Sequence, residues 1–276
     1  MSARLRGIAK ENEEIVAAGA YRLPDGREIR LADDIAAAVA GTRLYGPEPV
    51  PVTPDTDRPT VLDVTGESST QAARRLTAAA PGAVAVLNFA SARNPGGGYV
   101  NGAQAQEEAL CRASALYTTL LRAPAYYAHH RADRSPFYSH RVIISPGVPV
   151  FRDDRGRLLE IPYQAGFLTS PAPNAGVITR RTPEEAHRIP AALATRAERV
   201  LEVAAAGGYR RLVLGAWGCG VFRNDPAEVA GAFRTLLGPG GRFGGHFDEA
   251  VFAVLDRTAG ERTLGAFRRV FTGASA

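Results

Sequence analysis

The hydrophobic and polar positions of the chain form a repeating pattern of short apolar runs followed by longer periodic stretches. From residue 60 onward, the short runs indicate strands, and stretches with apolar residues three or four positions apart indicate helices. The expected strands are Thr60–Val64, Ala83–Phe89, His140–Ser145, Gly166–Ser170, Arg211–Ala216 and Phe247–Leu255. The expected helices are Ser68–Ala80, Gln106–Leu121, Thr182–Ala206, a helix from the capping residue Asp225 to Leu237, and Glu261–Phe271. This alternation predicts an α/β layered domain that binds ligands where loops leave the carboxyl ends of strands.

The first 59 residues follow a different pattern. They contain an expected helix over Arg4–Ala18, a hairpin over Tyr21–Leu31, and a short helix that Asp33 caps and that stops at Gly41. The segment Gly46–Pro59 holds five prolines among polar residues and is expected to be an extended linker. We therefore predict an accessory N-terminal extension with a helix and a hairpin (residues 1–59), without chemistry of its own, and a main domain (residues 60–276).

Two glycine-rich stretches follow expected strands, and both are candidate binding loops. The first contains Gly96-Gly97-Gly98. Glycine allows positive φ and a close approach to a ligand, and the backbone N–H groups of such a loop can converge on an anion such as a pyrophosphate. A mobile connection is the alternative interpretation of three glycines in a row.

The second stretch is Gly215–Asp225, with the sequence GAWGCGVFRND. Gly218 and Gly220 allow a tight turn that cradles an anion, and Phe222 is placed to stack on a sugar or a base. The alternative is an ordinary strand-to-helix turn with Phe222 in the core. The spacing is not a dinucleotide-binding fingerprint, and no phosphate-binding GxxxxGK[ST] motif is present.

A pair of adjacent carboxylates, Glu107 and Glu108, opens the helix after the first glycine loop. Acidic residues in a first helical turn offset the helix dipole and need no further role. Two like charges side by side also raise the proton affinity of one of them, which suits a general acid. Capping and catalysis therefore both remain open at this point.

Composition limits the class of protein. The chain has 276 residues, 45% of them hydrophobic, which supports a sizeable core. No run of about 18 apolar residues occurs and Met1–Lys10 lacks the apolar segment of a signal peptide, so a soluble, cytoplasmic protein without membrane association is expected. Cys111 and Cys219 are far apart and form no CxxC pair, so neither a disulfide framework nor a zinc site is indicated; Cys111 is expected to be buried.

Charge adds little to this. The net charge is +5, and Lys10 is the one lysine among 33 basic residues. The arginines are dispersed and do not interleave with aromatic residues, so direct DNA binding is not expected. A mildly positive protein would attract a polyanionic substrate.

The triple glycine, a gap of seven residues and Gln106-Glu107-Glu108 together resemble the GGG…QEE signature of poly(ADP-ribose) glycohydrolases. The surrounding NFASARNPGGG and AQEEALCRAS resemble the bacterial-type branch of that family. Similarity extends from about Thr60 to the C-terminus, including Ile144–Asp153 and Leu214–Pro226. The resemblance implies a macrodomain fold, a mixed sheet sandwiched by helices. It also implies cleavage of the ribose–ribose O-glycosidic bonds of poly(ADP-ribose), releasing ADP-ribose without a metal or a cofactor.

The resemblance also implies roles for individual residues. Glu108 is expected to protonate the leaving oxygen and then, as a carboxylate, to activate water, while Glu107 binds ribose hydroxyls and keeps the proton affinity of Glu108 high. Ser91 departs from the pattern, because many macrodomains carry asparagine there. The expected substrate-binding residues are Ser91, Asn94, Gly96, Gly97, Gly98, Gln106, Gly218, Cys219, Gly220, Val221 and Phe222.

The implied partners are poly(ADP-ribose) and ADP-ribosylated proteins, with a monomeric enzyme. Two alternatives stay open: a hydrolase of mono-ADP-ribosylated proteins, whose domains typically lack the QEE triplet, and a non-catalytic ADP-ribose reader, which would need no adjacent glutamates. Outside these motifs, Tyr126-Tyr127 and His129-His130 are expected in a solvated, mobile loop, and Gly238–Gly245 in a flexible connector.

Overall fold

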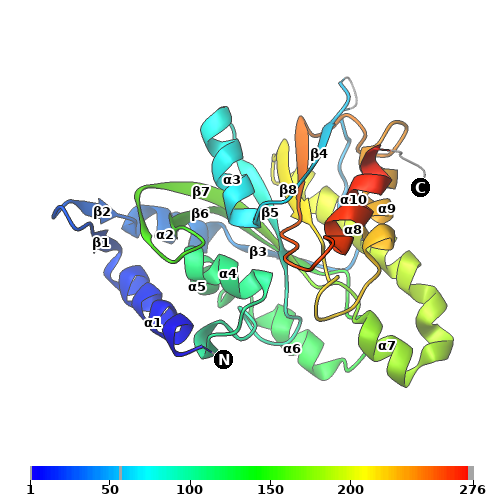
Figure 1. Ribbon diagram of the computed structural model, residues 1–276, viewed down its shortest axis with the longest axis horizontal. Helices are drawn as coiled ribbons and strands as arrows, with labels where there is room; N and C mark the ends of the chain where they lie inside the picture. The colour runs from blue at the N-terminus through cyan, green and yellow to red at the C-terminus, as the bar shows by residue number, and fades with distance from the viewer. Residues whose placement is uncertain (1, 56–57, 273–276) are drawn as a thin grey trace.

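A mixed seven-stranded sheet forms the centre of the molecule in the computed structural model, which describes residues 2–55 and 58–272 (Figure 1). The strand order is β3-β6-β7-β5-β8-β9-β4. The central strand β5 runs parallel to both of its neighbours, β7 and β8, whereas β6 is antiparallel to β7 and β3. The strands are β3 (Arg43–Tyr45), β4 (Val61–Thr65), β5 (Val84–Phe89), β6 (Val142–Arg152), β7 (Leu158–Ser170), β8 (Arg211–Gly215) and β9 (Glu249–Ala253). The expected mixed sheet is confirmed.

Helices cover both faces of this sheet (Figure 1). The helices are α1 (Ala3–Ala18), α2 (Ala32–Gly41), α3 (Ser69–Ala79), α4 (Gln106–Ala113), α5 (Leu116–Leu120), α6 (Pro124–Ala132), α7 (Ala175–Arg181), α8 (Ile189–Ala206), α9 (Pro226–Leu237) and α10 (Arg262–Thr272), with 3₁₀ turns η1 (Tyr99–Asn101) and η2 (Pro183–Arg188). None of the described helices is both long and apolar enough to cross a membrane.

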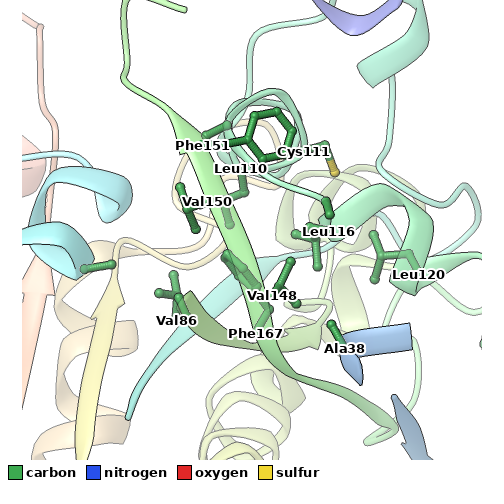
Figure 2. Packing of buried hydrophobic residues seen from close by; sticks show 14 of the residues in the cluster. Ala38, Val86, Leu110, Cys111, Leu116, Leu120, Val148, Val150, Phe151 and Phe167 are labelled. Carbon is green, nitrogen blue, oxygen red and sulfur yellow. The ribbon is translucent and has the colours of Figure 1, made fainter. Parts of the chain in front are cut away.

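The sheet separates two hydrophobic cores, and the alternation along β5 shows how. Val84 and Val86 point into the core shared with α1–α6, whereas Ala85 and Leu87 point into the core shared with α7–α10. Figure 2 shows part of the first core, where Leu110 and Cys111 of α4 lie near Phe151 of β6. Strand β5 is therefore buried on both faces, which fixes the position of the loop that follows it.

Strands β6 and β7 extend further than the expected strands His140–Ser145 and Gly166–Ser170: β6 ends at Arg152, and β7 begins at Leu158. Strand β6 continues through Pro146 and Gly147 because the register shifts between Ser145 and Val148, so the Pro-Gly pair forms a bulge and does not end the strand. The expected helix Gln106–Leu121 is interrupted instead, since Ser114 bridges to Val150 of β6 and separates α4 from α5.

The N-terminal residues pack into the same folded unit as the rest. Strand β3 pairs with β6 at one edge of the main sheet, a short hairpin links β1 (Ala20–Arg22) to β2 (Glu28–Arg30), and α1 and α2 contribute to the first core. Val50 and Val52 of the proline-rich segment pack against the second core. The division at residue 59 stays a prediction, but packing is continuous across it.

The expected flexible connector Gly238–Gly245 is a turn held by the fully buried Phe243, so that expectation was wrong.

Candidate active site

Both glycine-rich loops leave the same edge of the sheet from neighbouring strands. Strand β5 ends at Phe89 and leads into the first loop, and β8 ends at Gly215 and leads into the second. Because β5 and β8 are paired and parallel, their carboxyl ends and the two loops lie side by side. The strand–loop–helix order predicted around both loops is confirmed.

The first glycine loop is packed against the two glutamates. Gly96 and Gly97 have positive φ of 63° and 58°, which glycine adopts without strain. A Cβ built on Gly97 would lie 2.5 Å from Oε1 of Glu108 and 3.2 Å from Oε2 of Glu107. Glycine is therefore required at position 97 both for its backbone conformation and for the space that the carboxyl groups occupy.

Glu107 is 2% exposed and points toward the end of β5. Its Oε1 accepts a hydrogen bond from Nδ2 of Asn88 (3.1 Å), and its Oε2 accepts one from the backbone N–H of Ser91 (2.7 Å). Burial raises the pKa of Glu107 to about 8, although both hydrogen bonds act in the opposite direction. Burial therefore favours the protonated form of Glu107. The sequence led us to expect Glu107 to raise the proton affinity of its neighbour, but the carboxyl whose pKa burial raises is Glu107 itself.

Glu108 joins the glycine loop to the start of α4. Its Oε1 accepts a hydrogen bond from the N–H of Gly98 (2.9 Å), and its Oε2 accepts one from the N–H of Ala105 (2.9 Å), the residue before the helix. The side chain is 7% exposed, more than that of Glu107. Glu108 thus satisfies one N–H group at the helix terminus and one in the glycine loop, and it lies at the mouth of that loop.

Gln106 is engaged inside the protein. Its Oε1 accepts from the N–H of Phe89 (2.9 Å), and its Nε2 donates to the carbonyl of Leu87 (2.8 Å) and to Oγ of Ser69 (3.1 Å). The side chain therefore pairs with backbone groups of the last three residues of β5 and ties α3 to α4. Its expected contact with substrate stays a prediction.

The second loop is shaped by Gly218 and Asn224. Gly218 has φ +71°, and a Cβ on it would clash with Ala172 and with the Asn224 side chain. Nδ2 of Asn224 donates to the carbonyls of Pro173 (2.8 Å) and Gly218 (3.1 Å), which holds the loop in a tight turn. Trp217 lies below it, 1% exposed, and donates to the carbonyl of Ser170 (3.0 Å). Asn224 was not singled out from the sequence.

The outer part of the second loop is open. Val221 is 80% exposed, Gly220 is also exposed, and Phe222 is partly buried. The Phe222 ring lies 5.8 Å, centroid to centroid, from that of Tyr138. An aromatic face beside a backbone turn can contact a sugar or a base.

On the first loop, Ser91 accepts at Oγ from the N–H of Asn94 (3.2 Å), and Asn94 is exposed.

Known proteins share the sequence and the fold of this chain. The family described as microbial-type PARG, catalytic domain, matches residues 9–153. A solved poly(ADP-ribose) glycohydrolase from Thermomonospora curvata is 52% identical, with a TM-score of 0.92, and the match covers 98% of this chain and 100% of that one. This chain belongs to the microbial-type poly(ADP-ribose) glycohydrolase family. No match was found among curated proteins.

Further solved members of the glycohydrolase family carry ligands. The T. curvata enzyme bound to the inhibitor ADP-HPD is 53% identical over 97% of this chain and 99% of that one, with a TM-score of 0.91. The enzyme from Deinococcus radiodurans in complex with ADP-ribose is 46% identical over 90% of this chain and 100% of that one, with a TM-score of 0.81. The likeness confirms the expected macrodomain-like fold and the bacterial-type branch.

The two cysteines of this family member lie beside the loops. Cys111 is fully buried on α4, as expected, and a Cβ on Gly96 would lie 3.2 Å from its Sγ. Burial raises the pKa of the Cys111 thiol, and that of Cys219 to about 12. Both therefore remain thiols at neutral pH. Within residues 2–55 and 58–272, no three histidine, cysteine, aspartate or glutamate side chains gather as metal ligands would.

One expectation about the site's surroundings was wrong. Tyr126, Tyr127 and His130 do not lie in a solvated loop; they are buried on α6, which begins with Pro124 at its first position. Burial lowers the pKa of His130 to about 4, so the imidazole is neutral and bonds to Ser139. The signal in the sequence was the aromatic and histidine spacing of four residues after a proline, which places both on one helical face.

Asn88 is a second buried residue beside the candidate site that sequence reasoning missed. It is fully buried next to Thr169 of β7, and its Nδ2 donates both to Glu107 and to Oγ1 of Thr169 (3.1 Å). Its Oδ1 has no hydrogen-bond partner in the described part of the chain. A polar residue as the fifth position of the apolar run VAVLNF was the available signal.

Proposed function

We propose that this protein hydrolyses the ribose–ribose O-glycosidic bonds of poly(ADP-ribose) and releases ADP-ribose. The proposal depends mainly on one observation: two adjacent buried glutamates, Glu107 and Glu108, lie against the glycine loop that leaves β5. The neighbouring loop at Gly218 offers a second backbone turn for a diphosphate. Complexes of relatives with ADP-ribose and with ADP-HPD support this assignment.

The bond to be broken defines what the glutamates have to do. The leaving 2′-oxygen needs a proton, and the anomeric carbon, which becomes oxocarbenium-like, needs a water molecule. We assign proton donation to Glu108, the more exposed carboxyl at the mouth of the loop. In this proposal Glu108 takes up a proton as substrate binds and donates it to the leaving 2′-oxygen. The carboxylate that remains then accepts a proton from the attacking water molecule.

In this proposal Glu107 contacts ribose hydroxyls. The two glycine loops hold the diphosphate, so that binding energy far from the bond positions the glycosidic oxygen. Phe222 orients the terminal ribose. The chemistry assigned to these groups uses carboxyl groups and water, and we propose that it proceeds without a metal.

The test is a product analysis with purified protein in EDTA. Poly(ADP-ribosyl)ated protein and mono-ADP-ribosylated protein are incubated separately, and released products are followed by chromatography. Release of ADP-ribose from the polymer, with the protein-linked unit left in place, supports the proposal. Release from the mono-modified protein alone would favour a mono-ADP-ribosyl hydrolase, and binding of ADP-ribose without any release would favour a reader. A strict requirement for divalent ions would overturn the metal-independent mechanism.

Other expectations stay predictions. A monomer should elute at 29.2 kDa by size exclusion coupled to light scattering. The modified proteins on which the enzyme acts, the absence of direct DNA binding, and the cytoplasmic location each call for an experiment: pull-down, electrophoretic mobility shift and cell fractionation.

A further inference from the structure

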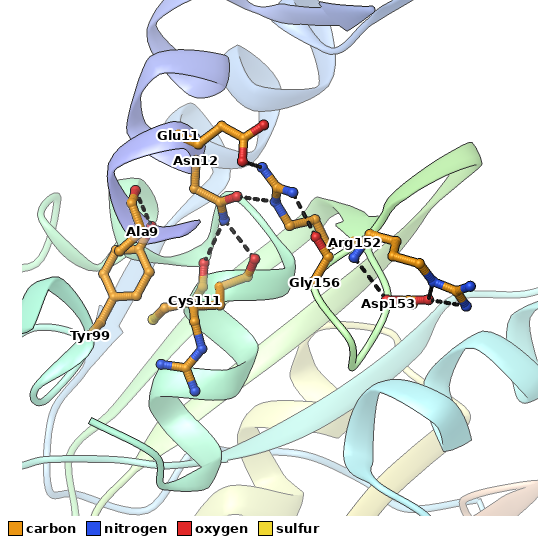
Figure 3. A network of polar contacts seen from close by, with 10 residues as sticks. Ala9, Glu11, Asn12, Tyr99, Cys111, Arg152, Asp153 and Gly156 are labelled. Atoms are coloured by element: carbon orange, nitrogen blue, oxygen red, sulfur yellow. Dashed lines mark hydrogen bonds and ion pairs between the residues drawn. The ribbon is translucent and has the colours of Figure 1, made fainter. Parts of the chain in front are cut away.

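The segment that carries the two glutamates is contacted at both of its ends by the N-terminal helix α1 (Figure 3). This segment runs from η1, directly after the three glycines, to the last turn of α4. The first 59 residues, which include α1, were expected to form an accessory extension without chemistry of its own. Three contacts connect α1 to backbone and side chains on either side of Glu107 and Glu108.

The first contact is at Tyr99, the residue after Gly98. Its hydroxyl lies 2.9 Å from Oε1 of Glu13 and 3.2 Å from the carbonyl oxygen of Ala9, and it can donate its proton to either. Tyr99 is 1% exposed, and burial raises its pKa, so the hydroxyl remains a donor. Its backbone N–H donates to the carbonyl of Gly96, which connects this contact directly to the glycine loop.

The second contact is at the other end of the segment. Nδ2 of Asn12 donates to the carbonyls of Cys111 (3.2 Å) and Arg112 (2.7 Å) in the last turn of α4. Oδ1 of Asn12 accepts from Nε of Arg152 (2.6 Å), so every polar atom of this fully buried side chain is paired. Carbonyls in the last turn of a helix have no partner within the helix, and Asn12 supplies one.

A third contact lies between these two. Gly102 has φ +74°, and a Cβ there would lie 2.6 Å from the carbonyl oxygen of Ser2, the residue that caps α1. The N–H of Ser2 donates to the carbonyl of Gly102 (3.3 Å). The start of α1 therefore rests on the turn that joins η1 to α4.

These contacts restrict how α4 can move. A helix of eight residues is about 12 Å long and behaves as a rigid rod, so holding its last turn sets the position of its first turn. The first turn carries Glu107 and Glu108. Because a misplacement of about 1 Å at a reacting group can cost about 100-fold in rate, such restraint matters for catalysis.

We propose that α1 is part of the catalytic apparatus, with Asn12, Glu13 and Tyr99 as positioning residues that hold Glu107 and Glu108 at the glycine loop. This rests on the proposed function of the two glutamates. The N-terminal helix would then act on kcat through the placement of the carboxyls, and not only on the stability of the fold.

The experiment compares kcat and KM for poly(ADP-ribose) in Tyr99→Phe, Glu13→Ala and Glu13→Gln. We expect Tyr99→Phe and Glu13→Ala to lower kcat by about tenfold with KM changed less than about twofold. Glu13→Gln keeps an oxygen that accepts from Tyr99 and should recover most of the lost kcat. All assays are run below the melting temperature of each variant.

Two control variants separate positioning from stability. Ile15→Ala shortens a buried side chain on the same helix and should lower the melting temperature without lowering kcat. Lys10→Ala removes an exposed ion pair with Glu14 and should change neither. Wild-type kcat in Tyr99→Phe and Glu13→Ala would overturn the inference, as would an equal loss of kcat in Ile15→Ala. Wild-type protein without activity would instead overturn the proposed function.

Discussion

The raised pKa of Glu107 predicts that the protein becomes less stable between about pH 4.5 and pH 8. Its pKa rises from an ordinary value of 4.5 to about 8. Over this range the unfolded chain releases the proton and the folded protein keeps it, so stability that is fully present below pH 4.5 is lost as pH rises through 8. At about 1.4 kcal/mol per pKa unit, the largest possible loss from this group is about 5 kcal/mol.

Glu107→Gln should remove this dependence. A glutamine stays neutral at every pH, and the Oδ1 atom of Asn88 that has no partner in the described chain can turn to accept from the new amide. The assay is urea unfolding at pH 5 and pH 8.5, with Glu14→Gln, an exposed carboxyl on α1, as the control. We expect the free energy of unfolding to fall by at least about 2 kcal/mol in wild type and in the control, and much less in Glu107→Gln. Equal pH dependence in wild type and Glu107→Gln would refute the reasoning.

Three further predictions follow from the site. Glu108→Gln should lower kcat by about 10²- to 10⁴-fold while calorimetry shows ADP-ribose still bound; loss of binding would contradict its role as the acid. Gly97→Ala should lower ADP-ribose affinity by more than about tenfold, whereas Gly208→Ala, with a similar φ of +75° and open space, should cost about 1–2 kcal/mol of stability alone. Phe222→Ala should raise KM by about 2- to 10-fold and Tyr138→Phe, which keeps the ring, should not; equal KM values for all three proteins would remove Phe222 from the substrate site.

Much of the site followed from local sequence because its parts are local in the chain. The triple glycine, the capping glutamates and the strand before them are contiguous, and their geometry is set by backbone preferences that single residues reveal. The second loop was also placed correctly, since a strand before Gly215 and a capping Asp225 bracket it. The strand pairing in the sheet was needed only to show that the two loops are neighbours.

The remaining features depend on contacts distant in sequence. Asn12 reaches Arg112, and Asn88 reaches Thr169, so neither could be assigned a partner from its own surroundings. Strand β6 runs through Pro146 because β7 pairs with it on both sides of the bulge, which overrides a strong local stop signal. The pKa of each carboxyl also depends on its burial. The sequence alone does not show which of two adjacent glutamates is the more deeply buried.

The protected state of the two thiols has a consequence for chemical attack on the protein. Reactive oxygen species and electrophilic reagents attack thiolates, and burial keeps Cys111 and Cys219 protonated. Cys111 also lies directly beneath Gly96. Oxygen atoms added to its sulfur by oxidation would therefore clash with the glycine loop. Both thiols should therefore react slowly with oxidants near neutral pH. For the same reason, neither Cys111 nor Cys219 is a favourable target for an inhibitor that forms a bond with sulfur.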